Sequence, residues 1–313
     1  MLIVKLFGSG QAHYFGKNLA GFPNQQPTLL LCYLLLNKGY PHSREQLSAV
    51  FWNDCPTHVA RKSLRNSLWR LRQIIQTAGA PADEYLLVNE DSVSFINSSL
   101  YWLDSEIFEK ITALYQEIPG EELTREQAER LEDALDLYSG DLLESVYEDW
   151  VLYERERLGI SYINNLSKLM IHYGMTGNYE RGLACGERIL TRDNTREKVH
   201  RQMMWLYFLL GDRNSALAQY KRCCQILLEE LGIEPMEETR QLFEQITYNQ
   251  FRPQAWAGEK VPSRLASPAG QPSPDSVKQM MNRLHYLQMK LDEASTELRI
   301  LEKMMRDSMG NIE

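Results

Sequence analysis

Residues 61–76 combine a narrow leucine stripe with a dense basic surface. Leu64, Leu68, Leu71 and Ile75 recur at helical spacing, so one face of the predicted helix would be buried. The other faces carry basic side chains with no acidic residue among them: Arg61, Lys62, Arg65, Arg70 and Arg72. A helix of this kind suits insertion into the major groove of DNA, where such side chains can contact phosphates and base edges.

Seven residues of this helix are candidates for DNA contact. With the leucines buried, the opposite face presents Lys62, Asn66, Trp69 and Gln73, and it is flanked by Arg61, Arg65 and Arg70. Arg can grip guanine, and Asn or Gln adenine, through two hydrogen bonds, so we expect Arg65 and Asn66 to read bases. We expect Arg61, Lys62 and Arg70 to hold phosphates, and Arg72 to pair with an acid inside the domain. Taken alone, the pattern fits a solvated basic helix equally well.

The charge of the chain is unevenly distributed. The 313 residues carry a formal net charge of −8, but the first hundred contain nine basic and six acidic residues and so carry +3. The remainder carries −11. A basic head on an acidic body indicates a polyanion-binding module attached to a protein-binding one.

The first hundred residues have the pattern of a winged helix-turn-helix with an N-terminal sheet. Ser43-Arg-Glu-Gln46 is a capping box that begins the helix preceding the basic one. Gly79 to Pro81 ends the basic helix, and two apolar runs around residues 89–92 predict a hairpin, the wing. The order of elements is strand, strand, three helices, strand, strand, with ranges 2–7, 12–15, 27–38, 46–51, 57–78, 85–88 and 93–96.

The rest of the chain is predicted to be helical, with a repeat. The segment beginning at Gly177 aligns with the segment beginning at Gly211, an offset of 34 residues, which is the tetratricopeptide period. Such helix pairs stack and leave a concave groove. The predicted fold class is therefore mainly α with a small β component: a winged helix over 1–100 and a tetratricopeptide-like domain over 101–250.

A linker and then a heptad repeat of apolar residues, which we call the heptad seam, follow the helical repeats. Residues 251–275 contain five prolines and are expected to form a linker. Apolar residues then alternate by three and four between positions 277 and 305, which predicts a coiled-coil helix over 276–308 and a homodimer through 277–305. In a parallel pair, Glu297 of one helix would face Glu302 of the other, and the two carboxylates would repel each other. In an antiparallel pair, Arg283 could approach Glu297 instead. We therefore expect an antiparallel or an intramolecular arrangement.

The order of these parts resembles a known family, the SARP-type bacterial transcriptional activators, over residues 3–246. That family joins an OmpR-like winged helix to a bacterial transcriptional activation domain of tetratricopeptide type. The resemblance is carried by several segments in order: 43–54, 60–72 with its Arg70-Leu71-Arg72, Leu137-Tyr-Ser-Gly140-Asp-Leu-Leu143, Trp150, 154–158, Arg196-Glu197, Gly211, and Leu231-Gly232-Ile-Glu-Pro235. The resemblance implies binding of double-stranded DNA and contact of the helical repeats with RNA polymerase or another regulator.

The wing departs from the family pattern. Its predicted tip is Asn89-Glu90-Asp91-Ser92, which is acidic and lacks glycine, whereas wings of the family carry a glycine and a basic or aromatic tip. Carboxylates aimed at phosphates repel them, so we expect that this wing does not contact DNA closely.

The sequence favours a DNA-binding regulator over an enzyme. It offers no Ser-His-Asp or Cys-His arrangement and no paired metal-ligand spacing, so we assign no catalytic residue, cofactor or metal. Five scattered cysteines and the lack of a bilayer-length apolar run predict a cytoplasmic protein without a membrane partner. The main interpretation is a sequence-specific transcriptional activator. The alternative is a protein-binding adaptor whose winged helix has lost its affinity for DNA.

Overall fold

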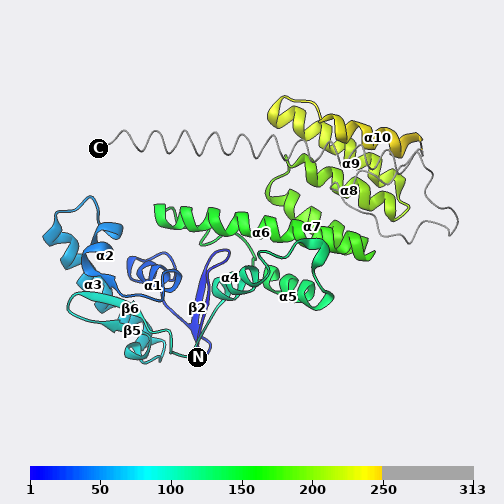
Figure 1. Ribbon diagram of the computed structural model, residues 1–313. Coiled ribbons are helices and arrows are strands. Elements are labelled where there is room, and N and C mark those ends of the chain that lie inside the picture. The colour runs from blue at the N-terminus through cyan, green and yellow to red at the C-terminus, as the bar shows by residue number, and fades with distance from the viewer. Residues whose placement is uncertain (249–313) are drawn as a thin grey trace, which may run out of the picture. The chain divides into compact units, whose positions relative to one another are not determined.

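The computed structural model describes residues 1–248, which contain both globular parts (Figure 1). The N-terminal part is built from short strands around three helices. Its elements are β1 (Leu2–Lys5), β2 (Gln11–Tyr14), β3 (Lys17–Asn18), α1 (Gln26–Leu36), β4 (His42–Ser43), α2 (Arg44–Phe51), α3 (Thr57–Thr77), a 3-10 turn at Ala82–Glu84, β5 (Leu86–Val88), β6 (Ser92–Phe95) and β7 (Tyr101–Leu103).

The strands form two small sheets. In the first, the order is β3-β2-β1-β7, with β1 antiparallel to β2 and parallel to β7. In the second, the order is β4-β6-β5, and β5 and β6 form the predicted wing hairpin. The winged helix-turn-helix with an N-terminal sheet is confirmed. Strands β3, β4 and β7 were not predicted, because runs of two or three residues carry too little periodicity to identify a strand.

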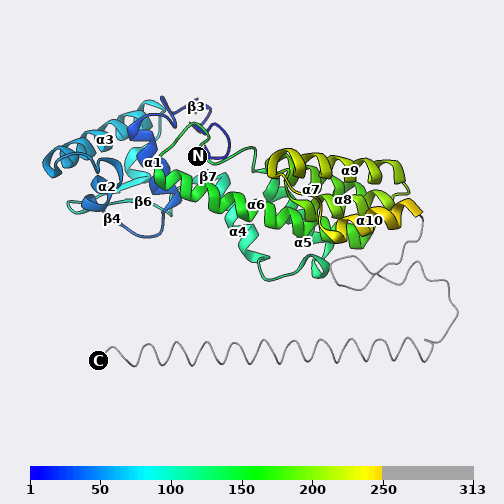
Figure 2. The same ribbon diagram turned by 90° about the horizontal axis from the view of Figure 1, so that it is seen from above.

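Local signals set the ends of the two helices that precede the wing. Ser43 caps α2: its hydroxyl accepts from the Gln46 backbone N–H at 3.0 Å, and the Gln46 side chain accepts from the Ser43 backbone N–H at 3.1 Å. This is the reciprocal capping box that the sequence predicts. Helix α3 begins directly after Pro56, whose ring fixes a backbone angle compatible with a helix start. Helices α2 and α3 pack against each other, and α1 packs on α3 (Figure 2).

Residues after β7 are helical, as predicted. The elements are α4 (Asp104–Leu114), a 3-10 turn at Gly120–Glu122, α5 (Arg125–Asp136), α6 (Asp149–Thr176), α7 (Tyr179–Arg192), α8 (Glu197–Leu209), α9 (Arg213–Ile226), a π-helical turn at Leu227–Leu231 and α10 (Glu237–Tyr248). Gly177 and Gly211, one repeat apart, have φ angles of 80° and 81°. Only glycine adopts this left-handed conformation at low cost, so each can end one helix of a pair and start the turn to the next.

A buried carboxylate joins the first sheet to the helical part. Asp104, the first residue of α4, is 2% exposed and accepts the backbone N–H groups of Leu6 and Phe7 at 2.8 and 3.1 Å. Burial raises the pKa of its carboxyl from 3.8 to about 6, against the lowering effect of these hydrogen bonds. A backbone bridge between Phe7 and Leu142 lies at the same junction. The end of β1 is thus tied to two segments of the helical part.

The arginine at position 155 reinforces this junction. Its guanidinium donates to the backbone carbonyls of Leu142, Leu143 and Val146 at 2.9, 2.6 and 2.7 Å. These carbonyls lie in the irregular segment between α5 and α6, where no helix supplies hydrogen-bond donors. A single side chain of α6 therefore satisfies three backbone acceptors and holds the segment that contacts β1.

Two predicted segments lie outside the described residues. They are the linker over 251–275 and the coiled-coil helix over 276–308, and both stay predictions. Within residues 1–248, no helix is long and apolar enough to cross a membrane.

Candidate nucleic-acid interface

Helix α3 is anchored by its leucine stripe. Leu64, Leu68, Leu71 and Ile75 are between 0% and 4% exposed, and they contribute to the core of the winged helix. Burying side chains of this size stabilises the position of a helix by roughly 1.5–3 kcal/mol each. The rotation of α3 about its axis is therefore fixed, and the remaining faces are presented to solvent.

All seven candidate DNA contacts lie on the exposed surface of this helix: Arg61, Lys62, Arg65, Asn66, Trp69, Arg70 and Gln73. Trp69 is 63% exposed, which is unusual for the largest apolar side chain and typical of a residue that meets a partner. The sequence pattern thus predicted the exposed face of α3 correctly. Which of these side chains contact bases or phosphates stays a prediction.

The basic residues of α3 differ in whether they already form an ion pair within the protein. Arg61 donates to the carboxylate of Glu45, at the start of α2, at 2.7 Å. Arg72 pairs with Asp83 at 3.1 Å, which confirms the pairing with an acid inside the domain. Among residues 1–248, no ion pair engages Lys62, Arg65 or Arg70. The unengaged cations are the ones most available to a polyanion.

The wing tip is held in place by an arginine that the sequence analysis did not single out. Arg44, the first residue of α2, donates through Nε and Nη2 to the carbonyl of Asn89 at 3.1 and 2.9 Å. Its backbone N–H also donates to the carbonyl of Asp91 at 3.0 Å. Residue 44 lies inside the capping box, but its contact with a residue 45 positions away leaves no local signal in the sequence.

A hollow separates the wing tip from α3. Its volume is about 610 Å³, and its lining comes from the end of β4, from α2, from α3 and from the wing: Ser43, Arg44, Glu45, Arg61, Leu64, Arg65, Glu90 and Asp91. Two of the seven candidate residues, Arg61 and Arg65, are therefore brought beside the acidic wing tip. The others lie on α3 outside this hollow.

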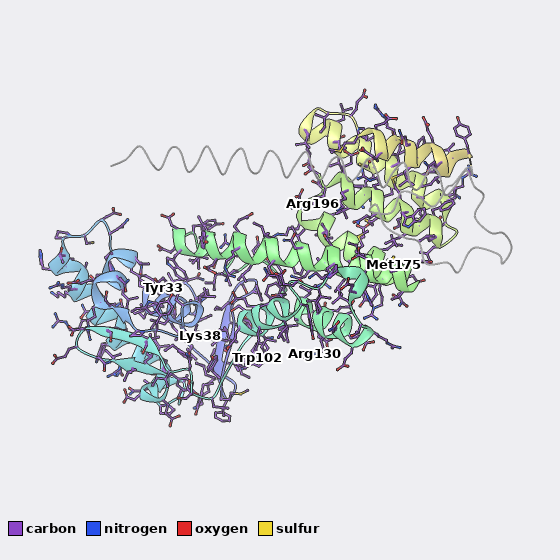
Figure 3. The ribbon with its side chains drawn as sticks, viewed as in Figure 1. Tyr33, Lys38, Trp102, Arg130, Met175 and Arg196 are labelled. Carbon is purple, nitrogen blue, oxygen red and sulfur yellow. The ribbon has the colours of Figure 1, made fainter. Side chains whose placement is uncertain are left out.

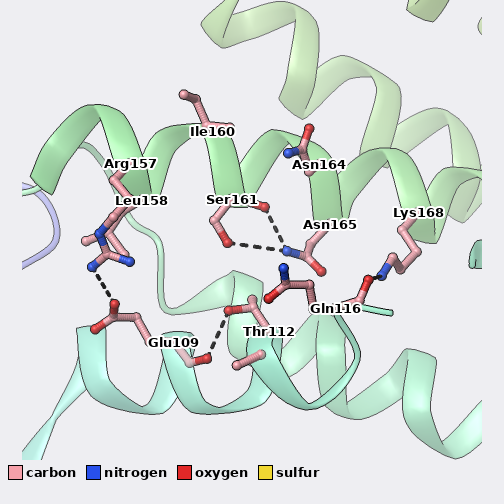
Figure 4. A pocket seen from close by; sticks show the side chains of 11 residues that line it. Glu109, Thr112, Gln116, Arg157, Leu158, Ile160, Ser161, Asn164, Asn165 and Lys168 are labelled. Atoms are coloured by element: carbon pink, nitrogen blue, oxygen red, sulfur yellow. Dashed lines mark hydrogen bonds and ion pairs between the residues drawn. The ribbon is translucent and has the colours of Figure 1, made fainter. Parts of the chain in front are cut away.

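A second hollow lies in the helical part, between α4 and α6 (Figure 4). Its volume is about 460 Å³, and its lining is mostly polar, including Gln116, Ser161, Asn164 and Asn165. Its cations are already engaged: Arg157 with Glu109 and Glu154, and Lys168 with the carbonyls that end α4. Figure 4 shows the contact between Arg157 and Glu109 and the contact of Lys168 at the end of α4. This hollow therefore offers polar groups, and both of its cations are already hydrogen-bonded.

The five cysteines of the described residues are free thiols, of which Cys55 is exposed, Cys224 is half-buried and the others are buried. Burial raises the pKa of the Cys185 thiol to about 12 and also raises the pKa of the Cys32 thiol. Such a thiol stays protonated and is a poor nucleophile. Within residues 1–248, no group of three His, Cys, Asp or Glu side chains lies close enough together to hold a metal ion.

Comparison with known proteins identifies the helical part. The family model described as "Bacterial transcriptional activator domain" matches residues 103–247. Residues 103–247 are therefore similar to bacterial transcriptional activator domains, and we call them the activator domain. The match begins at the last residue of β7 and ends in α10, so the activator domain comprises all the helices that follow the first sheet.

The similar curated proteins have names that describe regulators. The transcriptional regulatory protein MoaR1 of Mycobacterium bovis is 22% identical over 237 residues, which cover 72% of this chain and 72% of MoaR1. The regulatory protein AfsR of Streptomyces griseus is 23% identical over 260 residues, and the transcriptional regulatory protein EmbR of Mycobacterium tuberculosis is 25% identical over 242 residues. The matched regions span 25% of AfsR and 59% of EmbR. The SARP-type resemblance is confirmed.

A solved structure shows that the whole described architecture recurs. The structure is that of Mycobacterium tuberculosis EmbR in complex with a low-affinity phosphopeptide, with a TM-score of 0.61 and 22% identity. The similarity covers 79% of this chain, more than the activator domain alone, and 65% of that EmbR chain. The expected fold class, a winged helix followed by a tetratricopeptide-like helical domain, is therefore confirmed.

Proposed function

We propose that this protein is a sequence-specific DNA-binding transcriptional activator that reads the major groove with α3. One observation carries the proposal: the exposed face of a helix locked by four buried leucine and isoleucine side chains presents seven residues suited to DNA, while the chain as a whole is acidic. The activator domain over 103–247 and the regulatory names of similar proteins support it.

We assign roles to these residues by their chemistry. Arg65 and Asn66 contact base edges, because a guanidinium and an amide each make paired hydrogen bonds there. Arg61, Lys62 and Arg70 hold phosphates and set the register of α3 on the duplex. Trp69 and Gln73 lie on the same exposed face and complete the contact surface.

Equilibrium binding to duplex DNA tests this function. We expect the affinity of the full chain to fall steeply between about 50 and 200 mM salt, because each phosphate contact releases a counterion. R65A/N66A should weaken binding to a preferred site by about 2–6 kcal/mol, the sum of two paired base contacts. The matched control is R72A, which also removes an arginine from α3, but one that already pairs with Asp83. Equal effects of R65A/N66A and R72A would contradict the assignment.

The activator domain is proposed to contact RNA polymerase or another regulator. Support comes from exposed apolar side chains on α6: Tyr153 is 70% and Ile160 51% exposed, and a spacing of seven places them on one face. Replacement of both by Ala is expected to weaken binding of purified RNA polymerase without changing DNA affinity. Unchanged binding of polymerase would rule out this face.

The domain division and the dimer also belong to this proposal. We assign residues 1–100 to the winged helix, although β7 at Tyr101–Leu103 pairs with β1 and completes its sheet. Residues 101–250 then form the activator domain, 251–275 a linker and 276–308 a coiled-coil helix through which the chain forms a homodimer. A dimer would place two copies of α3 on repeated half-sites.

A second candidate function is a protein-binding adaptor that no longer binds DNA. The observation that favours it is the acidic wing tip beside α3, together with the ion pair that engages Arg61. The salt titration described above separates the two candidates, because an adaptor would show no salt-dependent affinity for duplex DNA.

A further inference from the structure

The hollow between the wing tip and α3 has balanced charges. Three arginines and three carboxylates line it: Arg44, Arg61 and Arg65, and Glu45, Glu90 and Asp91. Its formal charge is therefore zero, although it includes two of the basic residues of α3. The N-terminal end of α3 does not add its full positive charge to the DNA-facing surface.

The acidic side of this hollow is fixed rather than free to move away. The backbone of the wing tip is tied to α2 through the three hydrogen bonds that Arg44 makes with Asn89 and Asp91. Glu45, also on α2, is tied to Arg61 on α3. Arg44 thus holds the wing tip to α2, and Arg61 holds Glu45 to α3.

Of the three arginines of the hollow, Arg61 is ion-paired with Glu45 and Arg44 donates to a backbone carbonyl, whereas no ion pair or hydrogen bond of the Arg65 side chain is found in the described part of the chain. It shares the hollow with Glu90 and Asp91, so a phosphate that approached Arg65 from this side would meet two carboxylates. A neutral base edge would not be repelled in this way, because only the phosphates of DNA carry net charge. The hollow therefore weakens backbone contacts more than base contacts.

We propose that Glu45, Glu90 and Asp91 act as specificity-determining residues that lower the affinity of the winged helix for DNA of any sequence. The inference rests on the proposed DNA-binding function. Non-specific binding comes almost wholly from attraction to phosphates, whereas specific binding adds contacts to bases. A reduction of the first contribution raises the ratio of specific to non-specific affinity, which decides occupancy among the many competing sites of a genome.

The test compares E90Q/D91N with the wild-type full chain on a random-sequence duplex and on a site selected by the wild type. Both side chains are exposed, so the variant should fold normally, which a thermal melt verifies. We expect affinity for the random duplex to rise about tenfold near 50 mM salt, because about two more phosphates become accessible. Affinity for the selected site should rise less, so the specificity ratio should fall.

Two further variants sharpen the comparison. E121Q/E122Q removes the same number of negative charges from the 3-10 turn at Gly120–Glu122, which packs against α6 and not against α3, and should leave both affinities unchanged. E45Q should act in the same direction as E90Q/D91N, because it frees Arg61 from its ion pair.

The outcomes distinguish this inference from the proposed function. If the wild type binds DNA with a steep salt dependence and E90Q/D91N binds random duplex no more tightly, the inference is wrong and the function stands. If the wild type does not bind and E90Q/D91N does, the carboxylates suppress binding as inferred. If neither binds near 50 mM salt, both the inference and the function are overturned.

Discussion

Trp150, in the first turn of α6, meets Tyr33 of α1 edge to face, with ring centroids 5.3 Å apart and an interplanar angle of 87° (Tyr33 is labelled in Figure 3). Phe51, at the end of α2, lies 5.9 Å from Trp150 and 5.6 Å from Tyr33. The longest helix of the activator domain thus begins inside an aromatic cluster that includes the helix preceding α3. Packing of the activator domain and placement of α3, the proposed DNA-reading helix, are physically connected.

Trp150→Ala is expected to destabilise the protein by about 2–4 kcal/mol, because it leaves a cavity between Tyr33 and Phe51. Trp150→Phe should destabilise the protein less, because the phenyl ring can still contact Tyr33 and Phe51. Chemical denaturation monitored by circular dichroism measures both changes. The same loss of stability in the Phe and Ala variants would show that the ring contact is unimportant.

Trp69→Ala should affect DNA binding rather than stability, in contrast to Trp150→Ala. Because Trp69 is 63% exposed, its removal should change the free energy of unfolding by less than about 0.5 kcal/mol. DNA affinity should nevertheless fall, since this ring lies on the proposed contact face. A Trp69→Ala variant with full DNA affinity would remove this residue from the interface.

The two tryptophans illustrate what the sequence could and could not predict. The exposure of Trp69 follows from its position opposite the leucines of α3, which is a local helical pattern. The environment of Trp150 depends on Tyr33 and Phe51, about a hundred residues earlier, and no periodicity encodes that contact. The same holds for Arg44, whose place in a capping box was predictable but whose hold on the wing tip was not.

The buried carboxylate of Asp104 predicts a specific pH dependence. Its pKa is raised from 3.8 to about 6, so the folded protein binds this proton more tightly than the unfolded chain. The contribution of this proton to the free energy of unfolding is fully present below pH 3.8 and is lost as the pH rises through about 6. Asp104→Asn should remove this dependence, so that its stability relative to wild type rises by about 2 kcal/mol between pH 4 and 6.5.

Denaturation series for both proteins across this pH range measure the difference directly. The comparison cancels other carboxyl groups, such as that of Asp141, whose pKa is lowered beside Arg192 and Tyr138 and whose effect has the opposite sign. Parallel stability curves for wild type and Asp104→Asn would contradict the raised pKa.

Loss of the pair between Arg72 and Asp83 should have a small effect. The side chains are 38% and 80% exposed, and exposed ion pairs contribute only about 0–1 kcal/mol. Asp83→Asn is therefore expected to shift the melting temperature by only a few degrees, and added salt should abolish even that shift. A large, salt-independent loss would indicate that Asp83 has another structural role.

The heptad seam predicts the oligomeric state. A chain truncated after residue 255 lacks positions 277–305 and should sediment as a monomer, whereas the full chain should sediment as a dimer. Affinity for a single half-site should be similar for the two chains, and affinity for a double site should be lower for the truncated one. If the full and truncated chains sediment with the same number of chains per particle, the heptad repeat is excluded as the dimer contact.

Sequence periodicity was sufficient for the candidate interface because its geometry is set within one helix. Once Leu64, Leu68 and Leu71 are buried, the directions of all other α3 side chains follow from 3.6 residues per turn. The hollow beside the wing was not predictable, since its lining combines residues near positions 44, 61 and 90. Only the folded chain brings those three segments together.

Selection of bound sequences from a random duplex library, carried out in parallel with wild type and R65A/N66A, tests the central claim most directly. We expect the wild type to enrich one shared motif and the variant to lose preference at two or more of its base pairs, while R72A keeps the motif. Enrichment of the same motif to the same degree by R65A/N66A, or of no motif by the wild type, would contradict the assignment of α3 as the helix that reads DNA.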